Sequence, residues 1–208
     1  MNNIITIISF ASIISLAGCS GNKSKDDQKS SEKSLAEEST KPIEFIVIQA
    51  QSEPDTLKGS LAAVAVGKIG NIEIKISYHS PAVRGRIVWG GLVPYDKVWV
   101  TGAHMATCVE FSDDVMIENK TVPAGKYALF TIPGKEEWIV IINKNWQQHL
   151  TDKYDAKDDM VRVKVKPEIE ESNQERLRYL IESEGEAKGE LVIYWEKIEV
   201  SLPVKIKL

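Results

Sequence analysis

The sequence predicts a mainly β fold: an antiparallel β-sandwich, or a barrel-like domain, with one short helix. The first observation behind this prediction is strict alternation of apolar and polar residues, which indicates strands with one buried face. In the stretch 71–80, NIEIKISYHS, the isoleucines alternate with Glu73, Lys75 and Ser77. The second is the recurrence of turn-forming residues at short intervals, which is typical of antiparallel hairpins. The third is that helical segments do not alternate with strands as they do in parallel sheets.

The elements follow from these signals, within one β-rich domain expected over residues 43–208. Turn sequences at 118–120, 123–125 and 133–135 join neighbouring strands. The expected strands, in chain order, are NIEIKISYHS (71–80), VEF (109–111), VMI (115–117), TVP (121–123), KYALFTI (126–132), EEWIVII (136–142), MVRVKVKP (160–167) and the alternating C-terminal run 198–208. Because Pro203 cannot donate to a ladder, the last strand is expected at a sheet edge or broken at that point. Residues 143–153, NKNWQQHLTDK, lack alternation and are expected to hold the short helix.

The N-terminus has the pattern of a targeting signal. An uncharged apolar run from Ile4 to Leu16 is too short to span a bilayer, which needs about 20 residues, and has the length of a secretory signal. It ends in Leu16-Ala17-Gly18-Cys19, which resembles the lipobox of bacterial lipoproteins. That resemblance implies a signal peptide over 1–18, cleavage before Cys19, and a membrane anchor of acyl chains such as palmitate on this residue. The alternative is an ordinary cleaved signal with an incidental cysteine.

The segment behind this cysteine, residues 19–42, is expected to form a disordered tether. It contains no aromatic residue and almost no branched apolar residue, so it cannot bury enough surface to offset the entropy of ordering. Lys25-Asp26-Asp27 is similar to an export signal of surface lipoproteins in some gram-negative bacteria, or it is part of a polar linker. The expected location is the bacterial cell envelope, with the protein lipid-anchored to the outer membrane on its periplasmic or surface face.

Composition narrows the classes of function. The formal net charge of -4 argues against a general nucleic-acid binder, which would present a basic face. Five tryptophans lie between Trp89 and Trp195, and core anchoring is expected of them before a role as a ligand platform. If Cys19 carries lipid, Cys108 has no partner for a disulfide and is expected to be buried as a small hydrophobic residue.

Several motifs in a fixed order carry a family resemblance. They are Ser80-Pro81, Arg84-Gly85-Arg86, WGGLVPYDKVW (89–99), Thr101-Gly102-Ala103, PAGKY (123–127), FTIPGKEEW (130–138), Asn143-Lys144 and RVKVKP (162–167). From about residue 60 to the C-terminus, the chain resembles a bacterial family catalogued as domain of unknown function 2911. The resemblance implies a secreted or lipid-anchored β-rich protein and carries no catalytic residues. Many members read Trp-Arg-Thr-Gly-Ala-Asn-Glu where this chain has WVTGAHM (99–105), so this chain lacks their Arg and Glu.

A metal site is one candidate function. The chain has three histidines, His79 at a strand end, His104 after Thr-Gly-Ala, and His149 in the segment that lacks alternation. Because strand ends and loops of a sandwich gather at its two ends, the three imidazoles could meet and form an open site for zinc or copper. Cys108 shares a face with His104 in either a strand or a helix, and could join them. Met105 would join this soft cluster only if the backbone at 104–105 is irregular. The alternative is three unrelated polar residues and an inert thiol.

Two other functions remain open. A metal-dependent enzyme of the hydrolase type could use the same histidines, but no serine, including Ser77 and Ser80, lies in a recognisable nucleophile motif. A binding module could hold an anion between Arg84 and Arg86, with Trp99 in a nearby groove. The competing role for the arginines is to pair with acidic neighbours and pin the loop. The sequence therefore favours a lipid-anchored binding module for a small molecule or metal, and identifies neither its ligand nor a protein partner.

Overall fold

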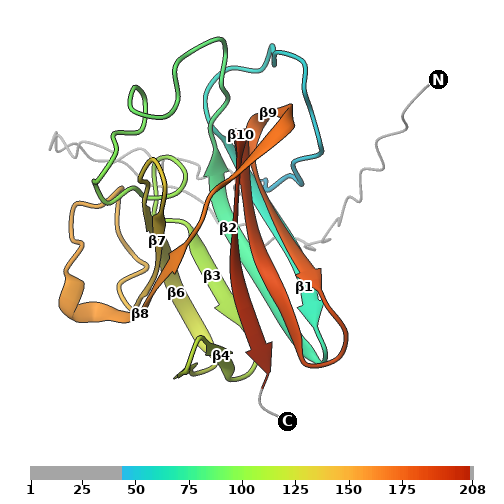
Figure 1. Ribbon diagram of the computed structural model, residues 1–208, viewed down its shortest axis with the longest axis vertical. Coiled ribbons are helices and arrows are strands. Elements are labelled where there is room, and N and C mark those ends of the chain that lie inside the picture. Colours follow the sequence, from blue (N-terminus) through green and yellow to red (C-terminus); the bar gives the residue numbers. More distant parts are fainter. Residues whose placement is uncertain (1–43, 207–208) are drawn as a thin grey trace, which may run out of the picture. The chain divides into compact units, whose positions relative to one another are not determined.

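The computed structural model describes residues 44–206, which form two antiparallel sheets packed face to face (Figure 1). The larger sheet has the strand order β1-β2-β3-β6-β7-β8, and the smaller has the order β5-β4-β10-β9. The strands are β1 (Leu61–Ile69), β2 (Ile72–Ser80), β3 (Cys108–Phe111), β4 (Val115–Ile117), β5 (Lys120–Val122), β6 (Gly125–Ile132), β7 (Trp138–Asn143), β8 (Asp159–Val165), β9 (Glu168–Ser183) and β10 (Lys188–Ile206). Neither sheet closes on itself, so the predicted β fold is confirmed in its sandwich form.

The main core lies between the two sheets and follows from the alternation of each strand. Ile74 and Ile76 of β2 are fully buried, whereas Lys75 between them is exposed. Leu191 and Ile193 of β10 meet this face from the smaller sheet. Burial of each such side chain stabilises the fold by about 1.5–3 kcal/mol. All buried core residues lie between positions 48 and 204, and 41–208 forms one compact unit, so this body carries its own core.

A second, smaller core covers part of the outer face of the larger sheet. Phe130 of β6 and Ile141 of β7 point away from the main core and are fully buried. Residues of the stretch 98–106 and of the loop 144–155 cover them, and Tyr154 meets the edge of the Phe130 ring at 5.4 Å between centroids. The large sheet is therefore buried on both faces where β6 and β7 run. This explains why KYALFTI and WIVIIN read as continuous apolar runs.

A buried ion pair fastens the segment that precedes β1. Ile46 forms a parallel bridge with Ala63, and the chain then crosses the end of the sandwich where β2 stops (Figure 1). The Asp55 carboxylate accepts a hydrogen bond from Arg176 of β9, and both side chains are almost fully buried. The same guanidinium donates to the carbonyl oxygens of Leu57, Gly59 and Ser80, so this single side chain ties the segment to both sheets.

Each strand predicted from the alternation and turn signals is present. Seven of the eight have ends within two residues of the predicted ones, whereas β10 begins at Lys188, ten residues before the predicted C-terminal run. No predicted strand corresponds to β1 or β9. Pro203 lies in the interior strand β10, not in an edge strand. The strand pairs with β9 as far as Glu199 and with β4 from Lys205, so the proline falls between the two ladders. Its missing N–H therefore costs no ladder hydrogen bond.

The prediction of a helix within 143–153 is wrong. In the described chain the only helical turn is a 3-10 turn at Ala156–Asp158, just beyond that segment. Side chains take the bonds that a helix would need: Asn143 Oδ1 accepts from Asn145 N–H, and the Gln148 amide binds both Asn145 O and Lys153 N–H. Short polar side chains that bond to nearby backbone compete with a helix in this way.

The signal peptide predicted over 1–18, the lipidated Cys19 and the tether over 19–42 lie outside the described residues. Within residues 44–206, no helix is long and apolar enough to cross a membrane.

Candidate functional site

The stretch that joins β2 to β3 forms the loops at one end of the sandwich (Figure 1). Within it, Thr101 has φ +52°, a left-handed conformation that costs a β-branched residue free energy. Its carbonyl oxygen accepts hydrogen bonds from Tyr179 Oη at 2.6 Å and Thr107 Oγ1 at 3.0 Å, and its hydroxyl lies 3.0 Å from Thr131 Oγ1. Contacts from β9, from β6 and from the end of its own loop therefore hold this strained residue in place.

Gly102 brings this loop against the end of β2. A Cβ atom at this position would lie 2.8 Å from Thr107 Oγ1 and 3.2 Å from the carbonyl oxygen of His79. The Thr107 hydroxyl is fully buried and already bonded to Thr101 O, so it cannot move away freely. Only glycine therefore allows the loop to pass this close to His79.

His79 and His104 meet at this point. Their rings lie edge to face with centroids 5.0 Å apart, although the residues are 25 positions apart in the chain. Burial, and then the neighbouring His104, lower the pKa of His79, so this imidazole is neutral at pH 7. A neutral imidazole keeps a nitrogen lone pair for a hydrogen bond or a metal ion.

A hollow of about 380 Å³ opens beside His79 on the outer face of the larger sheet. Its lining is mainly apolar and comes from three regions, namely the segment before β1, strands β2 and β3 with the loop between them, and the loop after β7. The lining residues are Phe45, Ser77, Tyr78, His79, Met105, Ala106, Cys108, Trp146 and Gln147. An apolar hollow with a few polar groups is the usual form of a small-ligand site.

Cys108 stands on the wall of this hollow, opposite Ser77 in the ladder between β3 and β2. His79 lies two residues further along the same face, so the histidine and the thiol share one surface. Burial raises the pKa of Cys108 to about 11, and the thiol therefore keeps its proton at neutral pH. Cys108 was expected to be buried, and the structure shows it only partly buried.

His149 occupies a different position. It lies opposite Met105 in an isolated bridge, and its Nδ1 is 3.1 Å from Asp152 Oδ2 in an exposed pair. Within residues 44–206, no three side chains of His, Cys, Asp or Glu are grouped so that they could hold one metal ion. The structure therefore brings together two of the three predicted imidazoles, and places Cys108 on the same wall as one of them.

Arg84 and Arg86 are exposed, and both donate to backbone carbonyl oxygens. Arg84 Nη2 binds the carbonyls of Leu57 and Gly59, while Arg86 binds those of Ala82 and Val83. In the described part of the chain neither forms an ion pair, so they pin loops through carbonyls and not through acidic neighbours. The hydrogen bonds that the two guanidinium groups form within residues 44–206 do not direct them toward a common anion site.

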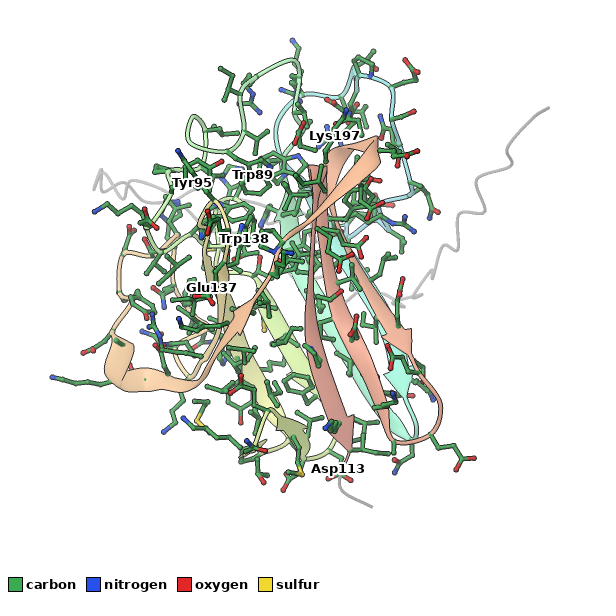
Figure 2. All side chains as sticks on the ribbon, viewed as in Figure 1. Trp89, Tyr95, Asp113, Glu137, Trp138 and Lys197 are labelled. Atoms are coloured by element: carbon green, nitrogen blue, oxygen red, sulfur yellow. The ribbon has the colours of Figure 1, made fainter. Side chains whose placement is uncertain are left out.

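Trp99 belongs to an aromatic cluster. Trp89 lies against Trp138 at 4.8 Å between centroids, near the end of the sandwich (Figure 2), and also contacts Trp99 and Trp195 at 5.8 and 5.7 Å. Trp99 and Trp195 are stacked at 5.7 Å. All four pack on the main core, as predicted for core anchors. Trp99 and Arg86 also line a separate hollow of about 300 Å³, and Arg84 is not among its lining residues.

The hydroxyls considered for a hydrolase are mostly committed elsewhere. Ser80 is fully buried and donates to the carbonyl oxygen of Leu177 at 2.7 Å, and Thr101 is held as described above. Ser77 alone lines the hollow with His79. The arrangement offers no activated nucleophile of the serine-hydrolase type.

Sequence reasoning missed the remaining walls of the hollow. Phe45 comes from the segment before β1, and Trp146 from the loop mistaken for a helix. No local pattern indicates that these two side chains reach β2. Met105 could join the predicted cluster only if the backbone at 104–105 is irregular. The structure meets this condition, because His104 has φ +61°.

Comparison with known proteins adds one match. A family model described as a protein of unknown function, DUF2911, matches residues 60–204. No curated protein and no solved structure matches the chain significantly. The matched region includes β1 to β10 almost entirely and both histidines of the pair. The chain therefore belongs to the DUF2911 family.

Proposed function

We propose that this protein is a lipid-anchored envelope lipoprotein whose β-sandwich binds a small ligand beside His79, with a metal ion held between His79 and His104. The observation that carries the proposal is the meeting of these two imidazoles at 5.0 Å between centroids, next to the hollow. Two imidazoles that bind one metal ion by about 2.0 Å bonds stand at a comparable separation. Zinc and copper both accept imidazole ligands.

The surroundings support a binding role. The loop that presents His104 is held by Thr101 and Gly102, so little ordering remains to be done when a ligand arrives. The lowered pKa of His79 leaves it uncharged and ready to coordinate or accept a hydrogen bond. The mainly apolar lining, with Phe45 and Trp146, would exclude water from the bound ligand.

Metal analysis of the body 41–208, made without a His-tag, tests the metal part of the proposal. We expect stoichiometric zinc or copper in the purified wild-type body and its loss in His104→Ala. A stabilised thermal transition on metal addition should vanish in the same variant. Absence of metal, together with an unchanged transition on addition of either ion, would rule out the imidazole pair as a metal site.

The anchor is tested separately. The full chain, expressed in a bacterium, should incorporate labelled palmitate and partition into detergent with the membrane fraction. Cys19→Ala should abolish both, whereas Cys108→Ala should leave both unchanged. Palmitate incorporation that persists in Cys19→Ala would contradict lipidation at this residue.

A metal-dependent hydrolase is the second candidate, because a metal ion on only two imidazoles would keep positions open for water and substrate. This function requires turnover of an ester or phosphoester that disappears with the metal and with His104→Ala. Binding of metal without such turnover would leave the binding module as the function.

A further inference from the structure

We propose, building on the proposed function, that the ion is monovalent copper, Cu(I), bound by the imidazoles of His79 and His104 and by the thioether of Met105. The juxtaposition behind the proposal consists of one ring contact of His79 and one hollow that it shares with Met105. Its ring meets that of His104, and it lines one wall with Met105.

The number and kind of ligands distinguish copper from zinc. Zinc sites use three or four nitrogen, oxygen or sulfur ligands, and residues 44–206 contain no such group of His, Cys, Asp or Glu. A methionine thioether is not included among those four residue types, and it is a soft, uncharged ligand of the kind that Cu(I) prefers. Two imidazoles and one thioether therefore complete a site for Cu(I) and leave a zinc site short.

The backbone explains how consecutive residues can serve one ion. In a regular strand, His104 and Met105 would point to opposite faces of the sheet. His104 instead has φ +61°, which breaks the alternation, and its carbonyl oxygen accepts a 2.6 Å hydrogen bond from Leu150 N–H. The imidazole of His104 then reaches His79 from one side while Met105 reaches the wall of the hollow.

Charge and solvation favour a monovalent ion as well. The hollow is lined mainly by apolar side chains, including Phe45 and Trp146. Moving an ion out of water costs free energy that rises steeply with its charge. The exposed side chains of His104 and Met105 leave the ion partly in contact with water. The lining contains no carboxylate that would neutralise a divalent ion. Cu(I) therefore fits these neutral ligands better than Zn(II) or Cu(II).

Competition for Cu(I) tests the proposal. The body 41–208 is titrated anaerobically, with ascorbate present, against the coloured Cu(I) complex of bathocuproine disulfonate. We expect the wild type to withdraw one Cu(I) per chain. His79→Gln, His104→Gln and Met105→Leu should each weaken this competition at least tenfold. His149→Gln is the matched histidine control and should stay within twofold of the wild type. Cys108→Ala tests the other sulfur that lines the hollow, and should weaken the competition less than Met105→Leu does.

The outcomes separate this inference from the proposed function. Binding of one Zn(II) per chain that depends on His79 and His104, without withdrawal of Cu(I), would retain the metal site and overturn the copper assignment. Loss of Cu(I) binding in Cys108→Ala but not in Met105→Leu would overturn the assigned sulfur ligand. Binding of neither ion would refute both proposals. Urea unfolding of each variant, followed by tryptophan fluorescence, identifies any loss of binding that comes from misfolding.

Discussion

Removal of the Asp55 carboxylate is the sharpest test of how the segment before β1 is held. The Asp55–Arg176 pair has side chains only 6% and 2% exposed, so Asp55→Ala leaves a buried guanidinium without its counter-charge. Breaking a buried pair from one side costs about 3–5 kcal/mol. Three carbonyl oxygens still accept from Arg176, which favours the lower end, about 3 kcal/mol.

Urea unfolding of the body, followed by the fluorescence of the tryptophan cluster, measures this cost. With a slope of about 2–3 kcal/mol per molar urea, a loss of about 3 kcal/mol lowers the midpoint by about 1–1.5 M. The matched control is Glu73→Ala, which removes an ion pair with Lys68 whose side chains are 62% and 63% exposed. Its midpoint should not move measurably, because exposed pairs contribute little. Equal midpoints for Asp55→Ala and Glu73→Ala would refute the argument from burial.

A double variant separates the pair from its packing. Replacing both partners, in Asp55→Ala with Arg176→Met, removes the buried charge together with its partner. We expect this variant to be more stable than Asp55→Ala alone, since an apolar replacement of both groups avoids the uncompensated charge. A double variant less stable than the single one would show that the carbonyl contacts of Arg176 outweigh its desolvation.

Three further predictions concern the core and the site. Gly102→Ala should lower the free energy of unfolding by about 1–3 kcal/mol, because the added Cβ would lie 2.8 Å from the buried Thr107 hydroxyl. An unchanged midpoint in urea would contradict this close approach. The pKa of Cys108 is raised to about 11, so little of the thiol is ionised at pH 8. Its reaction with iodoacetamide, followed by mass spectrometry, should be about 100-fold slower than that of an unhindered cysteine. A rate near that of free cysteine would contradict its burial. Burial raises the pKa of Tyr78 to about 12, so the folded state holds its proton longer than the unfolded state, and stability should fall as pH rises above about 10. Tyr78→Phe should show a shallower loss over pH 10–12, and an identical slope in the two proteins would contradict the assignment.

Strands with one apolar and one polar face could be predicted from alternation, whereas β6 and β7, which are buried on both faces, were predicted from the turn sequences beside them. β2 has this alternation along its whole length, and β8 has it from Val161 onward. β9 could not be recognised in this way, since Gln174, Glu175 and Arg176 occupy consecutive buried positions. Their burial depends on partners far along the chain: Gln174 donates to Gln49 O, and Glu175 accepts from the backbone of Arg84. Hydrophobic periodicity cannot detect a strand whose buried residues are polar.

The candidate site was predictable only in part, for a related reason. The expectation that strand ends and loops gather at one end of a sandwich correctly placed His79 near His104. The same argument could not predict that His149, in a neighbouring loop, contacts Asp152 instead. The loop conformation depends on side-chain bonds from Asn143 and Gln148 and on the strained residue Thr101, none of which has a periodic signature.

The strain in the stretch 99–104 is itself an argument about function. Thr101 and His104 both have positive φ, and each such residue costs about 1–3 kcal/mol. A sandwich needs only a connection between β2 and β3, and an unstrained loop would serve that purpose. Here, hydrogen bonds from Tyr179 and Thr107 stabilise the costly conformation, and Gly102 leaves room for it. This loop conformation places the ring of His104 against that of His79. Thr101→Gly separates the two roles, because it relieves the backbone strain and loosens the loop. If the variant is more stable but binds the proposed metal ion less tightly, the strained conformation of Thr101 serves the site at a cost in stability. Unchanged affinity would show that the position of His104 does not depend on that conformation.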